Sequence, residues 1–201
     1  MDPSVTPESA AALRPGILIL SAPSGGGKTS LARSLVEKRP DAGITVSHTT
    51  REQRAGERDG IDYYFTTRAH FEEMIQADAF IEYARVFDHY YGTSVEAIEY
   101  LLLNGRHAIL DIDWQGARNV RKKFPQAVSV FVMPPSVEEL EKRLRQRKRD
   151  SDETIARRMQ DAEDQISHKD EFDVIIVNDD FNRALDELES VLDRLPPARE
   201  R

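Results

Sequence analysis

The sequence of 201 residues contains no cysteine, no excess of positive charge and no long apolar run. Without cysteine, the chain can form neither a disulfide nor a thiolate metal site. The net charge of −8 argues against binding to nucleic acid, because proteins that bind it usually present basic surfaces. There is no 18-residue apolar stretch and no signal-peptide pattern at the N-terminus, so we expect a cytoplasmic protein that does not bind membranes.

Short apolar segments alternate with amphipathic ones along most of the chain. Runs such as GILILSA and DVIIVND predict buried strands, and the segments between the strands repeat apolar residues at helical spacing. This alternation predicts an α/β fold in which helices cover both faces of a parallel sheet, giving three layers. We expect strands at 16–22, 43–47, 107–113, 128–135 and 173–179, and helices at 28–39, 68–77, 94–104, 137–148, 153–168 and 181–195.

The segment APSGGGKT, residues 22–29, lies between the first expected strand and the first expected helix. A phosphate-binding loop requires this context. The glycines let several backbone N–H groups point at a phosphate, with the N-terminus of the helix behind them. Lys28 can reach the outer phosphates of a nucleoside triphosphate, and the Thr29 hydroxyl can join a magnesium shell. Ala22 stands where the strict pattern has glycine, and the remaining positions fit.

Two carboxylates end the apolar strand HAILDID. Asp111 and Asp113 should lie at the carboxyl edge of the sheet, where open α/β folds bind ligands. Carboxylate oxygens suit Mg²⁺, which prefers hard ligands and keeps several waters. Together with the glycine-rich loop, they predict binding of a nucleoside triphosphate with Mg²⁺.

The segment 47–60, SHTTREQRAGERDG, has arginines close together and a formal charge of zero. Arg51 and Arg54 can face one anion, and Tyr63 and Tyr91 can add phenolic donors, which predicts an acceptor that already carries a phosphate. The second pKa of a phosphate monoester is near 6, so such an acceptor needs no general base. If the acceptor base is guanine, Glu82, Ser47 and Thr93 could bind its polar edge, although spacing alone does not single out these three residues.

A set of motifs in this order resembles the guanylate kinases of bacterial type. The motifs are SAPSGGGKTS, VSHTTREQRAGERDGIDYYF, EYARVFDHYYGTS, LDIDWQG, PPSVEELEKRL and IVNDD. The resemblance covers residues 16–195. It implies a P-loop kinase of purine nucleotide metabolism that uses Mg²⁺ and transfers the ATP γ-phosphate to GMP or dGMP, giving ADP and GDP or dGDP.

The resemblance also implies roles for individual residues. Arg51, Arg54, Tyr63 and Tyr91 should meet the GMP phosphate, Ser47, Glu82 and Thr93 the guanine, and Asp111 the same nucleotide, while Thr29 and Asp113 support magnesium. The ATP site should comprise Ala22, Pro23, Ser24, Gly25, Gly26, Gly27, Lys28, Thr29, Ser30, Arg147 and Asn178, with Asn178 near adenine. The residues expected to act in catalysis are Lys28, Arg51, Arg143, Arg147 and Arg158.

Residues 1–15 are rich in Pro, Ser and Ala, which predicts a disordered tail. For the rest of the chain, the resemblance implies three structural units. We expect a phosphate-loop core of 16–46, 94–137 and 164–201. An inserted, mixed α/β domain at 47–93 should bind GMP, and a helical lid at 138–163 should close over ATP.

Some features leave other readings open. Gln53 replaces a proline that is frequent in the family, which predicts a less rigid loop between the two arginines. The cations of KRLRQRKR, residues 142–149, are flanked by acids, and a solvated helix face would explain most of this run. The acceptor could instead be another phosphorylated molecule such as ribose bisphosphate, or the chain could be a non-catalytic guanylate-kinase-like interaction module. The sequence also leaves open whether the chain forms a homo-oligomer.

Overall fold

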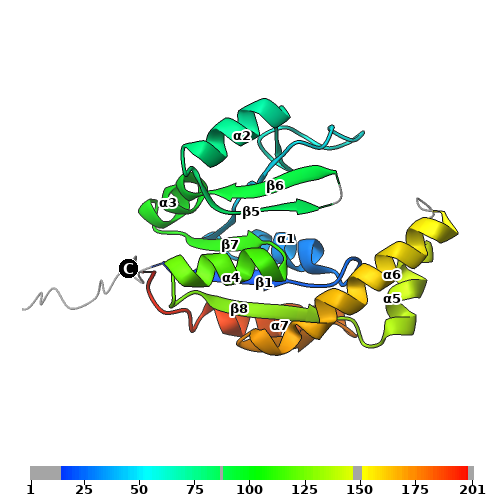
Figure 1. Cartoon of the computed structure of the whole chain (residues 1–201). Coiled ribbons are helices and arrows are strands. Elements are labelled where there is room, and N and C mark those ends of the chain that lie inside the picture. The colour runs from blue at the N-terminus through cyan, green and yellow to red at the C-terminus, as the bar shows by residue number, and fades with distance from the viewer. Residues whose placement is uncertain (1–14, 87, 147–150, 199–201) are drawn as a thin grey trace, which may run out of the picture.

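A computed structural model describes residues 15–86, 88–146 and 151–198. The expected tail lies outside these residues apart from residue 15. The centre of the fold is a five-stranded sheet with the order β2-β7-β1-β8-β9, in which every neighbouring pair is parallel. Its strands are β1 (Ile17–Ser21), β2 (Ala42–Ile44), β7 (His107–Asp111), β8 (Val128–Met133) and β9 (Val174–Val177). This sheet confirms the predicted α/β class (Figure 1).

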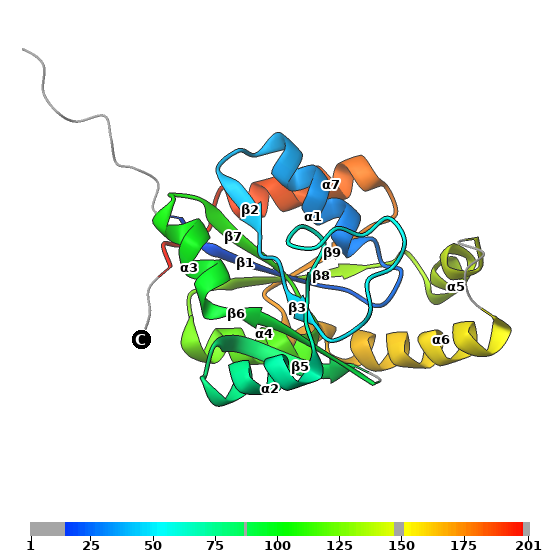
Figure 2. The same cartoon turned by 90° about the horizontal axis from the view of Figure 1, so that it is seen from above.

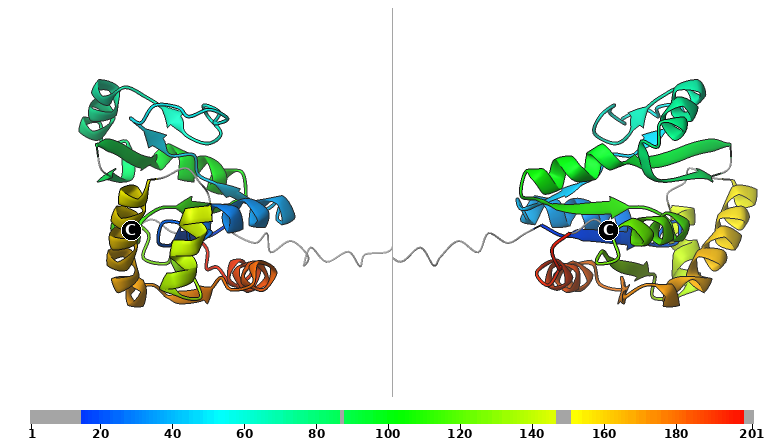
Figure 3. Two further views of the ribbon diagram at one scale, coloured as in Figure 1. Left: turned by 90° about the vertical axis from the view of Figure 1, so that its right-hand side faces the viewer. Right: turned by 60° about the vertical axis from the view of Figure 1, so that its left-hand side comes forward.

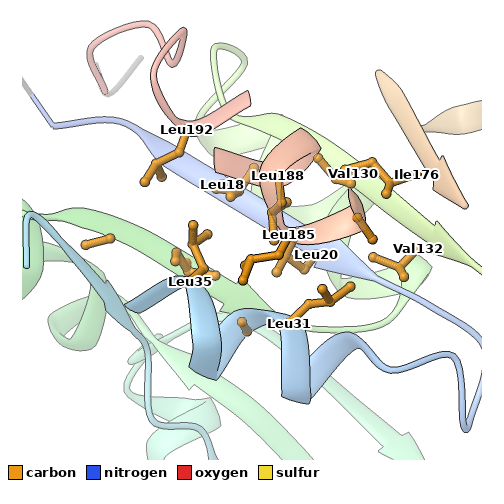
Figure 4. Packing of buried hydrophobic residues seen from close by; sticks show 14 of the residues in the cluster. Leu18, Leu20, Leu31, Leu35, Val130, Val132, Ile176, Leu185, Leu188 and Leu192 are labelled. Atoms are coloured by element: carbon orange, nitrogen blue, oxygen red, sulfur yellow. The ribbon is translucent and has the colours of Figure 1, made fainter. Parts of the chain in front are cut away.

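Helices cover both faces of the parallel sheet (Figure 2). Leu18 and Leu20 of β1 point to one face, where they meet α1 (Lys28–Lys38) and α7 (Phe181–Leu192). Figure 4 shows Leu31 and Leu35 of α1 with Leu185 and Leu188 of α7 against these strand leucines. The opposite residues of β1, Ile17 and Ile19, pack with α3 (Val95–Leu103) and α4 (Trp114–Lys123). Apolar side chains on both faces of β1 explain its continuous apolar run.

A second sheet of four strands stands above the first (Figure 1). Its order is β4-β3-β6-β5, with β4 at Tyr64–Phe65, β3 at His48–Thr49, β6 at His89–Ser94 and β5 at Phe80–Val86. The sheet is mixed, since β3 pairs in parallel with β4 and antiparallel with β6. Helix α2 (Arg68–Gln76) is anchored through the buried Phe71, whose ring stacks on Phe80 at 4.4 Å.

Two helices project from the carboxyl edge of the parallel sheet. They are α5 (Val137–Gln146) and α6 (Asp152–Ser167), followed by a short 3₁₀ turn at Lys169–Glu171. Figure 3 shows this pair beside the parallel sheet and below the second sheet. The two helices therefore stand at the edge where the glycine-rich loop leaves β1.

Two sequence expectations were wrong in detail. The strand expected at 43–47 is shorter, because β2 ends at Ile44 and residues 45–47 form the connection to β3 of the other sheet, which begins at His48. Helix α4 was missed, since its mean composition is polar and its buried residues are small or few: Gly116, Ala117 and Val120. Within the described residues, no helix has the length and apolar character needed to cross a membrane.

Candidate functional site

The glycine-rich loop links β1 to α1, as the sequence predicted. Gly25 and Gly27 have φ values of 95° and 96°, in the left-handed region that favours glycine. The Gly26 N–H donates to the Pro23 carbonyl at 2.8 Å, closing a tight turn before the helix. Because α1 begins at Lys28 with Gly27 as its N-cap, the loop faces the positive end of the helix. This geometry suits an anion with several oxygens.

Lys28 and Thr29 converge on one carboxylate. Lys28 Nζ lies 2.7 Å from Asp111 Oδ1, and the Thr29 hydroxyl donates to Asp111 Oδ2 at 2.7 Å. Lys28 also donates to the Ile112 carbonyl at 2.9 Å. Parallel pairing of β1 with β7 brings the ends of these two strands together across 82 residues of sequence. Asp111 thus lies directly beside the loop and holds the lysine in place.

Asp113 is the N-cap of helix α4. Its Oδ1 accepts a hydrogen bond of 2.8 Å from the Gly116 N–H, the usual geometry of an N-cap. The predicted magnesium residue therefore has a structural contact of its own. Among the described residues, no group of three or more His, Asp or Glu side chains is arranged to hold a metal ion.

Arg51 is held by Glu57 and lies against aromatic rings. Its Nη2 contacts both Glu57 oxygens at 2.8 and 3.0 Å, and its guanidinium lies 5.5 Å from the centre of the Tyr63 ring. Partial burial opposes the charge, yet the contact with Glu57 raises the pKa of Arg51 overall. Tyr91 meets Tyr63 edge-on at 5.9 Å, so three of the predicted phosphate ligands form one cluster.

The loop between the two arginines is tied together by Glu57 and Gln53. The Glu57 carboxylate accepts from the Arg54 backbone N–H at 2.9 Å, and the Gln53 side chain donates to the Glu57 carbonyl. Gln53, at which the sequence predicted a less rigid loop, thus makes a contact within the loop. Glu57, one of the three acids that offset the three arginines of this segment, has a role of its own because it orients Arg51.

The three residues considered for guanine form a second cluster. Glu82 Oε1 accepts from the Thr93 N–H at 2.9 Å, and the hydroxyls of Thr93 and Ser47 are 3.2 Å apart. Glu82 is only 6% exposed, and burial raises the pKa of its carboxyl to about 7. A carboxyl and two hydroxyls can together serve donors and an acceptor on one base edge.

Gly116 is a site residue that sequence reasoning missed. A Cβ at this position would lie 2.9 Å from Glu82 Oε2, so the glycine provides the room for that carboxylate. Gly116 lies in helix α4, whereas Glu82 belongs to β5 of the second sheet. The sequence signal was an otherwise unexplained glycine in the first turn of a helix that was itself not recognised.

The helices α5 and α6 place two predicted arginines near the loop. Arg158 donates to the Ser24 hydroxyl at 2.7 and 3.2 Å, and Arg143 donates to the Asn178 carbonyl at 3.0 Å. Arg147 lies outside the described residues. At the far end of α6, His168 stacks on Trp114 at 3.7 Å, which fixes the helix to α4.

Asn178 lies directly after β9 and is 5% exposed. Its side-chain amide donates to the Gly26 carbonyl at 2.9 Å. Sequence reasoning expected this residue near adenine, whereas its described contact is with the glycine-rich loop.

The two predicted half-sites open into one cavity of about 560 Å³. It adjoins a larger cleft of about 1250 Å³ between α6 and the second sheet. Both include Ser24, Arg54, Asp113 and Arg158 in their walls. The smaller cavity is lined by the whole loop from Ala22 to Ser30, together with Ser47, Arg54, Tyr63, Glu82, Tyr91, Asp111 and Asp113. A ligand at the loop and a ligand at the second sheet would therefore meet.

The parallel α/β core and the glycine-rich loop at its carboxyl edge define a P-loop nucleotide-binding protein. The guanylate kinase family model matches residues 14–195. The chain therefore belongs to the guanylate kinase family.

Individual relatives agree with this assignment. The chain is 54% identical to the guanylate kinase of Methylococcus capsulatus over 88% of this chain and 86% of that protein. It is 50% identical to the guanylate kinase of Escherichia coli K12 over 92% of this chain and 91% of that protein. Its fold is similar to the crystal structure of guanylate kinase from Anaplasma phagocytophilum. That comparison has a TM-score of 0.74 and 36% identity, and covers 89% of this chain and 85% of that chain.

Proposed function

We propose that this protein transfers the γ-phosphate of ATP to GMP or dGMP, giving ADP and GDP or dGDP. The observation that carries the proposal is the shared cavity of about 560 Å³, which joins the phosphate loop to the Glu82 and Tyr63 clusters. A donor and an acceptor bound there would be neighbours, and proximity is a main source of catalysis in phosphoryl transfer. This activity places the protein in purine nucleotide metabolism, and we expect it to act in the cytoplasm.

The acceptor would lie across the two clusters of the second sheet. Arg51, Arg54, Tyr63 and Tyr91 would hold the GMP phosphate, with Glu57 keeping the Arg51 fork in place. Glu82 would accept from the two guanine donors, N1–H and N2–H, and the hydroxyls of Ser47 and Thr93 would serve O6. Asp111 would bound the site on the side of the loop. Paired arginine forks and a buried carboxyl would together select a guanine nucleotide over a free base.

The donor phosphates would lie in the loop. Backbone N–H groups and Lys28 would hold the β- and γ-phosphates. Lys28 would also stabilise the negative charge that develops on the β–γ bridging oxygen during transfer. Arg143, Arg147 and Arg158 would neutralise the remaining negative charge and exclude water. The ionised GMP phosphate attacks without a general base, since its second pKa is near 6.

The residues near the loop fit a magnesium ion. The Thr29 hydroxyl and the carboxylates of Asp111 and Asp113 offer hard oxygens at the end of β7, and the Thr29 and Asp111 oxygens lie 2.7 Å apart. Mg²⁺ usually takes few protein ligands and keeps waters and phosphate oxygens, so a site with few carboxylates suits it. When bound, the ion would neutralise charge on the donor phosphates.

We also propose the division of labour expected from the sequence. Residues 47–93 would bind GMP, 138–163 would form the lid, and the remainder from residue 16 onward would form the core. The separate four-stranded sheet and the projecting α5–α6 pair support these boundaries. Helix α6 continues to Ser167, so a rigid lid would extend slightly beyond residue 163.

A panel of acceptors tests the function. Purified protein, ATP and Mg²⁺ would be supplied with GMP, dGMP, AMP, UMP or ribose bisphosphate, and ADP formation would be measured. We expect turnover with GMP and dGMP only, and its loss in Lys28→Ala.

Two other results would contradict the proposal. Preferred turnover of ribose bisphosphate would support the related kinase, and absence of ATP binding would support the non-catalytic module. The intact glycine-rich loop and the family relatives favour neither alternative.

A further inference from the structure

Asn178 connects the last strand of the parallel sheet to the glycine-rich loop. Its backbone N–H donates to the Met133 carbonyl at 2.8 Å, which continues the pairing of β9 with β8. Its side-chain amide crosses 152 residues of sequence to donate to the Gly26 carbonyl at 2.9 Å. The residue is therefore fixed by the sheet at one end and holds the loop at the other.

The contact orients the peptide unit that joins Gly26 and Gly27. In a trans peptide the C=O and N–H groups point in opposite directions. When Asn178 holds the Gly26 oxygen on the sheet side, the Gly27 N–H points away from it. Gly27 is the N-cap of α1, so its N–H belongs to the group of donors that a bound phosphate would meet.

Asn178 is closely packed between the loop and the neighbouring helix. The residue is 5% exposed. A Cβ at Gly27 would overlap the Asn178 amide nitrogen, so glycine at position 27 and asparagine at 178 fit each other. Arg143 of α5 donates to the Asn178 carbonyl at 3.0 Å, which links the same residue to the neighbouring helix.

We infer that Asn178 is a positioning residue for the phosphate loop, acting on the donor phosphates through the Gly26–Gly27 peptide. The inference deepens the proposed function and rests on it, because it concerns how the same site holds its donor. It requires that removing the amide donor weakens binding of any ligand with a triphosphate, whatever its base.

The test compares ATP with tripolyphosphate, which has no base. Asn178→Asp replaces the amide nitrogen with an oxygen that repels the Gly26 carbonyl, and Asn178→Ala removes the contact without adding charge. Dissociation constants of Mg²⁺-tripolyphosphate, Mg²⁺-ATP and GMP would be measured by calorimetry. Asn119→Asp, the same chemical change on the exposed face of α4, controls for the added charge.

We expect Asn178→Asp to weaken the binding of tripolyphosphate and the binding of ATP by the same factor of about ten or more, equivalent to about 1.4 kcal/mol. GMP binding should stay within about twofold, and the ratio of kcat/KM for ATP over GTP as donor should not change. If Asn178→Asp fails to fold by circular dichroism, Asn178→Ala should show the same pattern with a smaller factor.

Two outcomes would overturn the inference. One is unchanged tripolyphosphate binding together with a lost preference for ATP over GTP, which would assign Asn178 to adenine. The other is unchanged binding of both ligands. The dissociation constants of tripolyphosphate and ATP are measured without an acceptor, so a failure here is separate from a failure of the acceptor panel.

Discussion

Glu82 should make the affinity for GMP depend on pH. Burial raises the pKa of this carboxyl from 4.5 to about 7, opposed by hydrogen bonds with Thr93 and assisted by the charge of Asp113. Guanine presents only donors to it, so the ionised carboxylate should bind the base more tightly than the protonated acid. GMP binding below pH 7 should then release a proton, and affinity should rise as pH rises through 7.

The size of the effect follows from the fraction of ionised protein. With a pKa of about 7, roughly 90% of the free protein has Glu82 protonated at pH 6 and roughly 10% at pH 8. The apparent Kd equals the intrinsic Kd divided by the competent fraction, so it should fall by about tenfold over this range. Ionisation of the GMP phosphate, with its second pKa near 6, should add only about a factor of two.

Calorimetric titration with GMP at pH 6, 7 and 8 would measure this dependence. Glu82→Gln is the matched control, because an amide of the same shape does not titrate. The variant should bind GMP weakly and show only the change of about twofold from the phosphate. Equal pH dependence in the wild type and the variant would refute the assignment of the proton to Glu82.

The same pKa shift should appear in the stability of the ligand-free protein. The folded-state pKa lies above the unfolded value, so the folded state binds more protons between pH 4.5 and 7. Stability should therefore fall as pH rises through this window, by roughly 3 kcal/mol at about 1.36 kcal/mol per unit. In urea unfolding, the free energy of unfolding of Glu82→Gln relative to wild type should increase between pH 5 and 8. A constant difference would show that burial does not raise the pKa.

Three further substitutions test separate parts of the site. Lys28→Ala should lower kcat by about 10²–10³-fold in a coupled ADP assay, because a preorganised charge is lost, and a loss below tenfold would contradict that role. Gly116→Ala, whose new Cβ would lie 2.9 Å from Glu82 Oε2, should raise the KM for GMP about fivefold or more while the KM for ATP stays constant. Equal rises for both substrates would instead indicate general damage. Glu57→Gln should release Arg51 from its ion pair and weaken the binding of GMP by about tenfold, with little effect on the binding of guanosine. Equal weakening of the binding of both ligands would show that Arg51 does not contact the phosphate.

Local patterns predicted much of the fold. Continuous apolar runs identified β1, β7 and β8, because strands buried on both faces have no polar alternation. The edge strand β9 has an equally apolar run, although its Ile175 and Val177 are exposed. Helix α4 escaped detection, since its composition is polar and its buried residues are only Gly116, Ala117 and Val120, two of which are small. The end of β2 at Ile44 could not be predicted either, because no local pattern in residues 43–47 specifies where the chain passes from one sheet to the other.

The site divides in the same way. By itself, the sequence determined the phosphate loop, since Gly25, Gly27 and Lys28 act through the backbone and side chains of one short segment. Only the tertiary structure decided how distant segments serve that loop. Parallel pairing of β1 with β7 brings the Asp111 carboxylate to Lys28. Packing of α4 on β5 places Gly116 against the Glu82 carboxylate, where only glycine leaves room for it. Pairing of β9 with β8 brings Asn178 to Gly26. These contacts join residues 34 to 152 positions apart, and sequence spacing specifies neither their distance nor their orientation.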